Sequence, residues 1–271
     1  LRANRKPEGR AELRLVVNAG SLMEEDDQRG LAHFVEHMAF NGTTHFPKME
    51  VVSFMESIGM RFGAHVNAST SFDETNFILQ IPTDKPAVTD KAMLILEDWA
   101  RGVSFDDAEI DKERGVIMEE WRLGRGAAAR LQDRQFPILL QGSRYADRLP
   151  IGKTEVIQNF KHDRLKKFYA DWYRPELMAV VAVGDFDTAA METLIKNHFG
   201  AIPASAAARP RPSYPVPDHP GTRYAIATDK EAAQTSVSVY NIVPFRDQST
   251  VGAYRRQIIE GLYSGMLTAR L

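Results

Sequence analysis

Two histidines and a glutamate, His33, Glu36 and His37, lie within a stretch of five residues. On an α-helix, which has about 3.6 residues per turn, these positions fall in one narrow sector of the helix surface. Two neutral imidazoles one turn apart can bind the same metal ion, and a carboxylate beside them can reach a water on that ion. The pattern H-x-x-E-H is the inverse of the H-E-x-x-H zinc-binding motif, and it predicts a metal site.

Apolar residues occupy most of the other positions between 30 and 40. A helix that is apolar nearly all round is a buried helix, and buried histidine and glutamate side chains need partners such as a metal ion. The alternative is that the motif is accidental and that the segment is an amphipathic helix with two hydrogen-bonded histidines. By chance, H-x-x-E-H arises in about one chain of this length and composition in a hundred. The metal hypothesis therefore requires a third ligand elsewhere in the chain.

A pair of glutamates further along the chain, Glu113 and Glu120, offers candidates for this ligand. They are seven residues apart, so they share one face of a helix, with Val116 and Ile117 nearby. Carboxylates beside aliphatic residues are unusual on a surface helix. Two interpretations stay open on this helix alone, a carboxylate that completes a metal site and a solvated carboxylate face.

The composition excludes several other kinds of site. The net charge of −2 gives no electrostatic footprint for nucleic acid or for an anionic membrane. Cysteine is absent, which excludes disulfides and cysteine-ligated metals. No apolar run approaches the length of a membrane span. With 271 residues, the chain is long enough for one large domain or two.

Local patterns predict alternating helices and strands along the first two hundred residues. Residues 21–29 contain four consecutive acidic residues, and we interpret them as a solvated turn. The segments 61–70 and 74–82 have the pattern of an antiparallel pair. The remaining expected elements are a strand at 12–20, helices at 30–40, 48–58, 86–102, 154–173 and 189–199, a helix from 107 past 121, and a buried central strand at 178–185.

Six prolines between 203 and 220 mark a domain boundary, because such a stretch cannot form helix or sheet interior. We expect a first domain at 1–203, a proline-rich linker at 204–220 and the start of a second domain at 221–271. Strands are expected at 222–226 and 235–243, and a helix at 254–271. That helix has no C-cap glycine, so we expect the chain to be a piece of a longer polypeptide.

The two motifs together resemble those of the pitrilysin/insulinase family of inverted-zincin metallopeptidases. The similarity extends over nearly the whole chain and is most specific in the blocks 30–43, 67–71 and 113–120. The chain looks most like the N-terminal portion of large bacterial zinc proteases. The segment between the two motifs is somewhat longer than in shorter family members, a difference we assign to the region 61–85.

The resemblance implies a role for each motif residue. One zinc ion per chain would be held by His33, His37 and Glu120, and Glu36 would be the general base that acts on a zinc-activated water. The first glutamate of the pair, Glu113, would not bind zinc itself but would lie next to the zinc ligands, and activity would depend on it.

The resemblance also implies where a substrate binds. A peptide would add as an extended strand at a sheet edge that includes Asn67 and Ala68. The alternative for these two residues is an ordinary strand end near a turn. Glu119 matches no ligand position and is expected to be structural or solvated.

The fold implied by the family is α+β, with a mixed, largely antiparallel sheet packed with helices and followed by the start of a second, similar domain. The expected function is a zinc-dependent endopeptidase that hydrolyses extended peptides or small unfolded proteins. Its expected partners are a peptide and the C-terminal half of the same polypeptide, without nucleic acid or a membrane span. We expect a periplasmic location, with the cytoplasm as the alternative. The rival functions are a non-catalytic structural or partner-binding subunit of this fold, and an interaction domain in which the motif is accidental.

Overall fold

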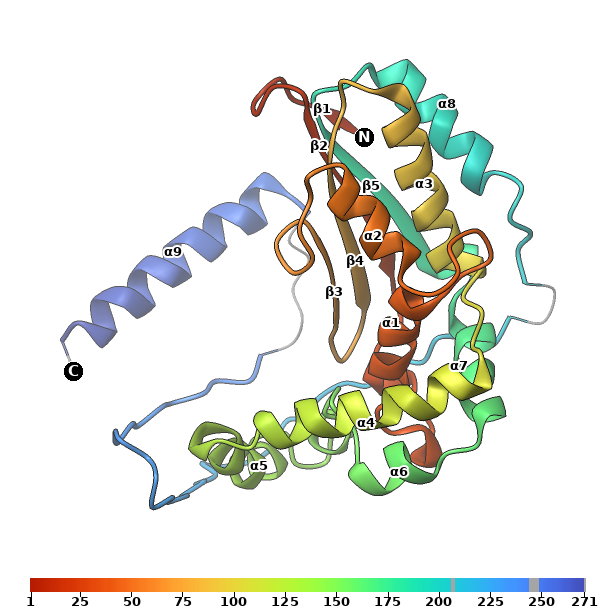
Figure 1. Cartoon of the computed structure of the whole chain (residues 1–271). Coiled ribbons are helices and arrows are strands. Elements are labelled where there is room, and N and C mark those ends of the chain that lie inside the picture. Colours follow the sequence, from red (N-terminus) through yellow and green to blue (C-terminus); the bar gives the residue numbers. More distant parts are fainter. Residues whose placement is uncertain (206–207, 244–248, 271) are drawn as a thin grey trace. The chain divides into compact units, whose positions relative to one another are not determined.

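A computed structural model describes residues 1–205, 208–243 and 249–270 (Figure 1). Its contacts divide the chain into two units, Leu1–Ala232 and Ala233–Leu271. Each unit is therefore described by itself.

The first unit is built on a five-stranded sheet with the strand order β1-β5-β2-β4-β3. Only β1 is parallel to its neighbour, and the other pairs are antiparallel. The strands are β1 (Arg2–Ala3), β2 (Arg10–Val17), β3 (Val66–Thr70), β4 (Thr75–Pro82) and β5 (Met178–Gly184). The sheet is mixed and largely antiparallel, which confirms the predicted α+β fold.

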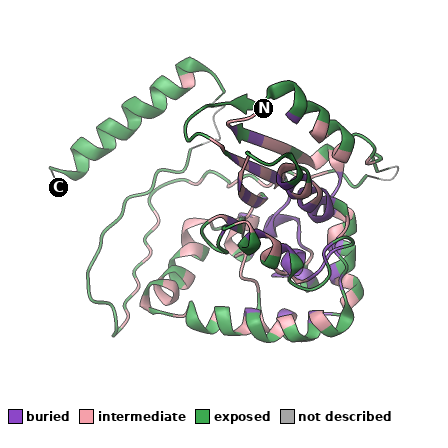
Figure 2. Cartoon of the chain, turned by 45° about the horizontal axis from the view of Figure 1, so that its top comes forward, coloured by how far each residue is buried: buried purple, intermediate pink, exposed green. Residues whose placement is uncertain are grey.

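One face of the sheet is buried and the other is partly exposed. Along β2, Leu13, Leu15 and Val17 are buried while the residues between them are only partly covered. Strand β4 alternates in the same way, with Phe77 and Leu79 among its buried residues. This period of two directs every second side chain toward the helices (Figure 2).

The helices of this unit cover the buried face and enclose α1. Helix α1 contacts β3 and β4 on one side and α4 and α7 on the other, and α3 contacts β2 and β4. The helices are α1 (Leu31–Asn41), α2 (Glu50–Ser57), α3 (Pro86–Arg101), α4 (Asp107–Leu123), α5 (Ala127–Leu139), α6 (Thr154–Asn159), α7 (His162–Trp172) and α8 (Thr188–Phe199). Four short 3-10 turns lie between them: η1 (Ser21–Met23), η2 (Asp26–Gln28), η3 (Arg144–Asp147) and η4 (Pro175–Leu177).

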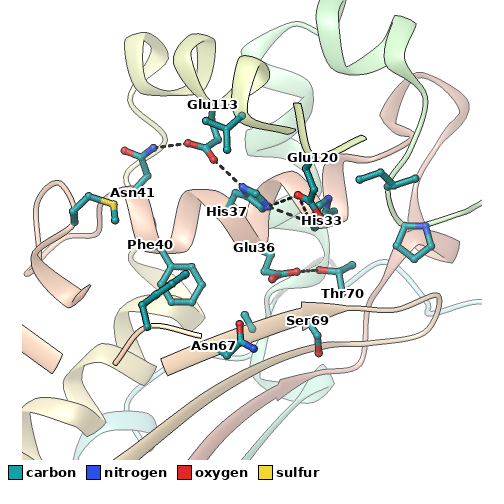
Figure 3. Close-up of a pocket in the computed structure, with 16 residues that line it drawn as sticks. His33, Glu36, His37, Phe40, Asn41, Asn67, Ser69, Thr70, Glu113 and Glu120 are labelled. Atoms are coloured by element: carbon teal, nitrogen blue, oxygen red, sulfur yellow. Dashed lines mark hydrogen bonds and ion pairs between the residues drawn. The ribbon is translucent and has the colours of Figure 1, made fainter. Parts of the chain in front are cut away.

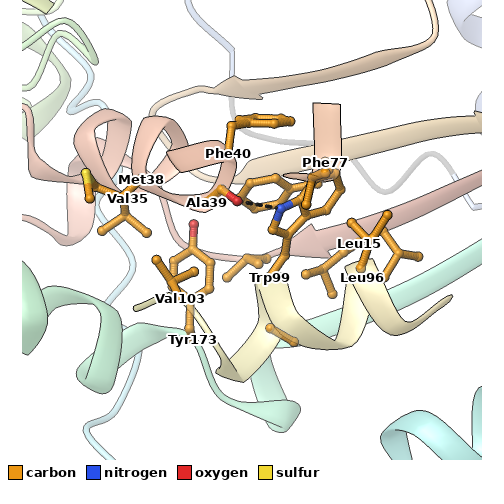
Figure 4. Packing of buried hydrophobic residues seen from close by; sticks show 14 of the residues in the cluster. Leu15, Val35, Met38, Ala39, Phe40, Phe77, Leu96, Trp99, Val103 and Tyr173 are labelled. Atoms are coloured by element: carbon orange, nitrogen blue, oxygen red, sulfur yellow. Dashed lines mark hydrogen bonds between the residues drawn. The ribbon is translucent and has the colours of Figure 1, made fainter. Parts of the chain in front are cut away.

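Trp99 of α3 holds the C-terminal half of α1 against the sheet (Figure 4). Its indole N–H donates to the carbonyl oxygen of Ala39 at 2.9 Å. The indole ring stacks on Phe77, with centroids 5.0 Å apart, and meets Phe40 edge-on at 5.2 Å. Such aromatic pairs add about 0.5–1.5 kcal/mol each beyond the area they bury.

The expected single helix at 154–173 is wrong, because the structure has two helices, α6 and α7. The chain is extended at Phe160, where ψ is 147°. The carbonyl oxygens of Ile157 and Phe160 accept hydrogen bonds from the Arg114 guanidinium at 2.6 and 2.7 Å. The Phe160 ring meets Phe34 of α1 edge-on at 4.9 Å. These contacts stabilise the break, since Arg114 supplies donors that a continuous helix would have provided itself.

The expected strand at 178–185 is present as β5, but the expectation that it is buried and central is wrong. Ala179 and Val183 are exposed, and Ala182 is buried. Strand β1 covers only the end of β5, where Arg2 pairs with Val183. The apolar run therefore lies near an edge of the sheet within this unit.

The acidic segment at 21–29 is not simply a solvated turn. Glu24 is completely buried, and its Oε1 accepts the backbone N–H groups of Gly30 at 3.0 Å and Ala32 at 2.9 Å. The first N–H groups of a helix have no partner within the helix, and they favour a carboxylate. Glu24 therefore caps α1, and burial raises its pKa to about 8 against the effect of these two N–H donors.

Two expected strands are absent from the structure. Residues 222–226 and 235–243 have neither helix nor strand, because no strand among the described residues pairs with them. In the second unit, the helix α9 (Val251–Thr268) replaces the expected helix at 254–271 with a slightly earlier start. Residues 244–248 and 271 lie outside the described residues.

The proline-rich stretch at 204–220 belongs to the first unit by its contacts, and its described residues form no helix or strand. Residues 206–207 of this stretch lie outside the description. The domain boundaries at 203 and 221 stay a prediction. Among the described residues, no helix combines the length and the apolar character needed to cross a membrane.

Candidate metal centre

The start of α1 is fixed by a close contact between two glycines. Gly30, the N-cap, has φ of +102°, and Gly152 has φ of +77°. A Cβ on Gly152 would lie 2.4 Å from the Gly30 Cα, so only glycine allows the loop 143–153 to cross here. The first turn of α1 is therefore held directly before His33.

The imidazoles of His33 and His37 meet on one side of α1, where α4 crosses it (Figure 3). Their Nε2 atoms are 3.2 Å apart. Oε2 of Glu120, from α4, lies 3.6 Å from Nε2 of His33 and 3.4 Å from Nε2 of His37. One ligand atom from each of these three residues lies within 4.8 Å of the others. The structure therefore brings together the three residues that the resemblance gives as ligands.

The donor set fits a metal ion. Burial, and then the charge of His37, lowers the pKa of His33 to about 3, so this imidazole is neutral at neutral pH. Burial alone would lower the pKa of His37, but the hydrogen bond and charge of Glu113, together with the charges of Glu36 and Glu120, outweigh burial and raise it. When both rings are neutral with hydrogen on Nδ1, two nitrogen lone pairs and one carboxylate oxygen face each other. Such a cluster needs a cation, and two histidines with one carboxylate suit Zn²⁺.

Glu113 lies behind His37 rather than among the three ligand atoms. Its Oε1 is 2.8 Å from Nδ1 of His37, and its Oε2 accepts a hydrogen bond from Nδ2 of Asn41 at 3.1 Å. This pair of contacts holds the His37 ring with Nε2 directed at Glu120. Asn41 was not among the predicted site residues, although it lies four residues after His37 and so shares its face of the helix.

Glu36 lies beside the ligands on the same helix and is only 8% exposed. Its Oε2 accepts a hydrogen bond from Oγ1 of Thr70 at 2.5 Å. Burial raises the pKa of Glu36, and the Thr70 hydrogen bond and His37 oppose this shift. Thr70 was not among the predicted site residues, although it belongs to the block 67–71.

Glu119 is exposed and lies away from the histidines. Its carboxylate forms an ion pair with Arg122 one turn later on α4, with a shortest distance of 2.5 Å. Of the two adjacent glutamates, only Glu120 reaches the histidines. The resemblance gives Glu120 rather than Glu119 as a zinc ligand, and this assignment stays a prediction.

A cavity of about 740 Å³ opens over the three candidate ligands, His33, His37 and Glu120. It is bounded by α1, α4, β3 and the loop at 150–151, and it contains Asn67 and Ala68. The structure thus brings these two residues to the cavity that holds the histidines. The other lining residues are His33, Glu36, His37, Phe40, Asn41, Met49, Phe62, Ser69, Thr70, Glu113, Val116, Glu120, Pro150 and Ile151.

Strand β3, which forms one wall of the cavity, is the last strand of the sheet, so one of its edges has no strand beside it among the described residues. The N–H of Gln80 donates to the His65 oxygen at 2.7 Å, and the N–H of Ser71 donates to the Glu74 oxygen at 2.8 Å. Bonded and non-bonded pairs alternate in an antiparallel ladder. The odd-numbered residues of β3 therefore direct their backbone groups at β4, and the even-numbered residues direct theirs at the free edge.

Only part of this free edge is covered. At its beginning, the N–H of Gly63 donates to the oxygen of Val66 at 2.8 Å. The next even-numbered residues are Ala68 and Thr70, and in the described part of the chain neither has a backbone neighbour on that side. Their backbone groups are therefore available to pair with an extended peptide beside the cavity.

Two family models match the chain. The model described as Insulinase (Peptidase family M16) matches residues 1–125, which include the motif on α1 and the pair Glu113 and Glu120 on α4. The model described as Peptidase M16 inactive domain matches residues 159–270. The chain belongs to peptidase family M16. The resemblance inferred from the two motifs is thereby confirmed.

M16 proteins similar to this chain are named zinc proteases. The chain is 42% identical over 272 residues to the zinc protease PQQL-like of Arabidopsis thaliana, covering 100% of this chain and 28% of that protein. It is 39% identical over 238 residues to the probable zinc protease PqqL of Escherichia coli, covering 88% of this chain and 26% of that protein. The chain thus spans little more than a quarter of the length of these relatives.

A solved M16 structure has the same fold. The first half of the periplasmic protease PqqL from Escherichia coli matches with a TM-score of 0.76 and 39% sequence identity. The match covers 80% of this chain and 46% of that one.

Proposed function

We propose that this chain carries the catalytic metal centre of a zinc-dependent endopeptidase that cleaves extended peptides or small unfolded proteins. The observation that carries the proposal is the convergence of His33, His37 and Glu120, with the buried carboxylate of Glu36 beside them. Glu36 is buried and the two histidines are partly buried, while Glu120 is exposed. A fold without a metal has no physical need to keep Glu36 and the two histidines in an apolar setting.

His33, His37 and Glu120 would hold one zinc ion per chain. When bound, zinc lowers the pKa of a coordinated water and polarises a peptide carbonyl. Glu113 keeps the His37 ring in the orientation that a ligand needs, through the 2.8 Å contact at Nδ1.

Glu36 would act as the general base. Its carboxylate takes a proton from the water whose oxygen attacks the carbonyl carbon of the scissile bond. When the C–N bond breaks, Glu36 returns a proton to the leaving amine nitrogen. The oxygen of the water stays with the new carboxyl group, so the base ends the cycle as it began.

The substrate would bind as an additional strand on the free edge of β3. Ala68 and Thr70 offer backbone donors and acceptors there, and Asn67 lies at the cavity with its side chain exposed. Main-chain pairing of this kind recognises an extended peptide irrespective of most side chains. A folded protein does not offer a free strand in this way, which favours unfolded or short substrates.

The rest of the enzyme would come from a longer polypeptide. The chain covers 28% and 26% of the two zinc proteases described above, so we propose a C-terminal half of the same polypeptide as its partner. The similar Escherichia coli protein is described as periplasmic, and we propose the same compartment in preference to the cytoplasm.

A comparison of Glu36→Gln with the wild type tests this function. With the rest of the polypeptide present, the wild type should cleave an unstructured fluorogenic peptide, and cleavage should stop when a chelator removes the metal. Glu36→Gln should retain zinc but lose activity by about 100- to 10,000-fold, the usual contribution of a positioned base. A zinc-loaded wild type that cleaves no peptide would instead indicate the partner-binding subunit.

A further inference from the structure

Thr70 is the residue through which the free edge of β3 touches the carboxylate of Glu36. The Thr70 hydroxyl donates to Oε2 of Glu36 at 2.5 Å. No other hydrogen bond to the Glu36 side chain is present in the part of the chain that the structure describes. Figure 3 shows the Thr70 side chain directed at Glu36, while Ser69 points away from it.

The alternation of β3 gives Thr70 contacts on two sides. Its side chain lies on the same face as Val66 and Ala68, the face that packs against α1. Its backbone N–H and C=O lie on the free edge, where the proposed peptide would pair. A single residue therefore touches both the peptide-binding edge and the base.

A carboxylate that serves as a base needs a fixed orientation. The last torsion of glutamate is broad and has no strong preference of its own. A donor on Oε2 holds the carboxylate plane and leaves Oε1 free to accept the proton of the water. Without this donor the carboxylate can rotate, and the fraction of enzyme with the base in place falls.

We infer that Thr70 is a positioning residue that orients Glu36 through its hydroxyl and couples the base to peptide pairing on β3. The inference rests on the proposed peptidase function. A peptide strand that pairs with the Thr70 backbone holds this residue in register, and the hydroxyl then holds Glu36 toward the scissile bond. Catalytic turnover, rather than peptide affinity, should depend on the hydroxyl.

Three substitutions at residue 70 and one control separate the hydroxyl from the shape of the side chain. Thr70→Val keeps the volume and removes the donor, Thr70→Ser keeps the donor, and Thr70→Ala removes the donor without steric strain. The control is Thr89→Val, the same chemical change on α3 outside the cavity lining. Each variant is measured for zinc content, for kcat and KM on one peptide, and by a crystal structure of the metal-free protein.

Thr70→Val and Thr70→Ala should lower kcat by about 10- to 100-fold, a part of what a positioned base contributes, with KM and zinc content unchanged. Thr70→Ser and Thr89→Val should stay within about threefold of the wild type, which is under 1 kcal/mol. In the crystal structures, the Glu36 carboxylate should have the same position in Thr70→Ser as in the wild type. In Thr70→Val it should be rotated away from that position.

An unchanged kcat in Thr70→Val, or an equal loss in Thr70→Ser, would overturn the inference. If the wild type itself cleaves no peptide, the proposed function fails, and the crystal structures still decide the case of Thr70. A Glu36 carboxylate that occupies the same position in wild type and Thr70→Val would then refute the positioning role.

Discussion

Nδ1 of His37 lies 2.8 Å from Oε1 of Glu113, while the corresponding nitrogen of His33 is buried and has no hydrogen-bond partner among the described residues. The two imidazoles of the motif are therefore supported differently. Glu113 fixes the ring of His37 and adds negative charge behind it, whereas His33 has polar contacts only at Nε2, with His37 and Glu120, among the described residues.

Substitution of Glu113 should weaken zinc binding through His37. Glu113→Gln keeps an acceptor for Nδ1 but loses the charge, so we expect a loss of zinc affinity of about tenfold, and about 100-fold for Glu113→Ala. Competition with a chromophoric chelator measures both. Glu109→Gln is the matched control, since Glu109 lies on the same helix and pairs with Lys112. An equal effect at Glu109 would show that the loss is not specific to His37.

The pH dependence of stability should contain a contribution from Glu24. Burial raises its pKa from the ordinary value of 4.5 to about 8, against the opposing N–H donors of Ala32 and Gly30. Between these pH values the folded protein keeps a proton that the unfolded chain releases. The free energy of unfolding therefore falls as pH rises through this window, and the contribution is fully present only below 4.5.

Glu24→Gln removes this titration while it keeps an acceptor for the N-terminus of α1. Urea unfolding of wild type and variant should show the variant gaining stability relative to the wild type as pH rises from about 4.5 to about 8. A difference that does not change with pH would mean that Glu24 is ionised in the folded protein at all of these pH values.

Substitution at Gly152 should be more damaging than at another glycine with the same backbone conformation. Gly152 and Gly59 have φ of +77° and +81°, but a Cβ on Gly59 meets nothing within 4 Å. Gly59→Ala should therefore lower the free energy of unfolding by about 1–2 kcal/mol, the cost of the left-handed backbone conformation alone. Gly152→Ala should cost more, because its Cβ would clash with the backbone of Gly30.

Denaturant unfolding of the two glycine variants measures the difference. Zinc affinity should fall only in Gly152→Ala, since this contact fixes the start of α1 before His33. Equal losses of stability would contradict the close packing of the two glycines.

The orientation of β3 makes a prediction for proline substitutions. The N–H of Ala68 faces the free edge, so Ala68→Pro removes no ladder hydrogen bond and should change stability by less than about 1 kcal/mol. It removes a donor to the peptide, and KM should rise by about tenfold, the value of one hydrogen bond. The N–H of Ser69 faces β4, so Ser69→Pro removes a ladder hydrogen bond and should destabilise the protein more than Ala68→Pro does.

Thermal unfolding and peptide kinetics of this pair test the orientation. If Ala68→Pro were the less stable of the two, the alternation along β3 would be the reverse of the one described.

The metal motif and the antiparallel pair at 61–70 and 74–82 could be predicted because they depend on local spacing, whereas the arrangement of the whole sheet was expected from the resemblance. His33 and His37 share a helix face because they are about one turn apart, and Glu113 and Glu120 share a face of a second helix because they are about two turns apart. Sequence alone could not decide between Glu119 and Glu120 without the resemblance, since the choice depends on how α4 crosses α1.

Features that depend on distant contacts were missed or wrong. Glu24 belongs to an acidic run, and only the fold shows that it caps a buried helix. The break at Phe160 depends on Arg114, some forty residues earlier in the chain. Thr70 has no charge and no spacing signal, and its contact with Glu36 joins a strand to a helix. Such pairings are set by tertiary packing rather than by local pattern.

The central claim is that His33, His37 and Glu120 form one zinc site. Elemental analysis of the purified wild type, Glu120→Gln and Glu119→Gln tests it most directly. We predict about one zinc per chain in the wild type and in Glu119→Gln, and little or none in Glu120→Gln, because a structural or catalytic zinc needs at least three protein ligands. Equal zinc content in the two glutamine variants, or none in the wild type at neutral pH, would contradict the account.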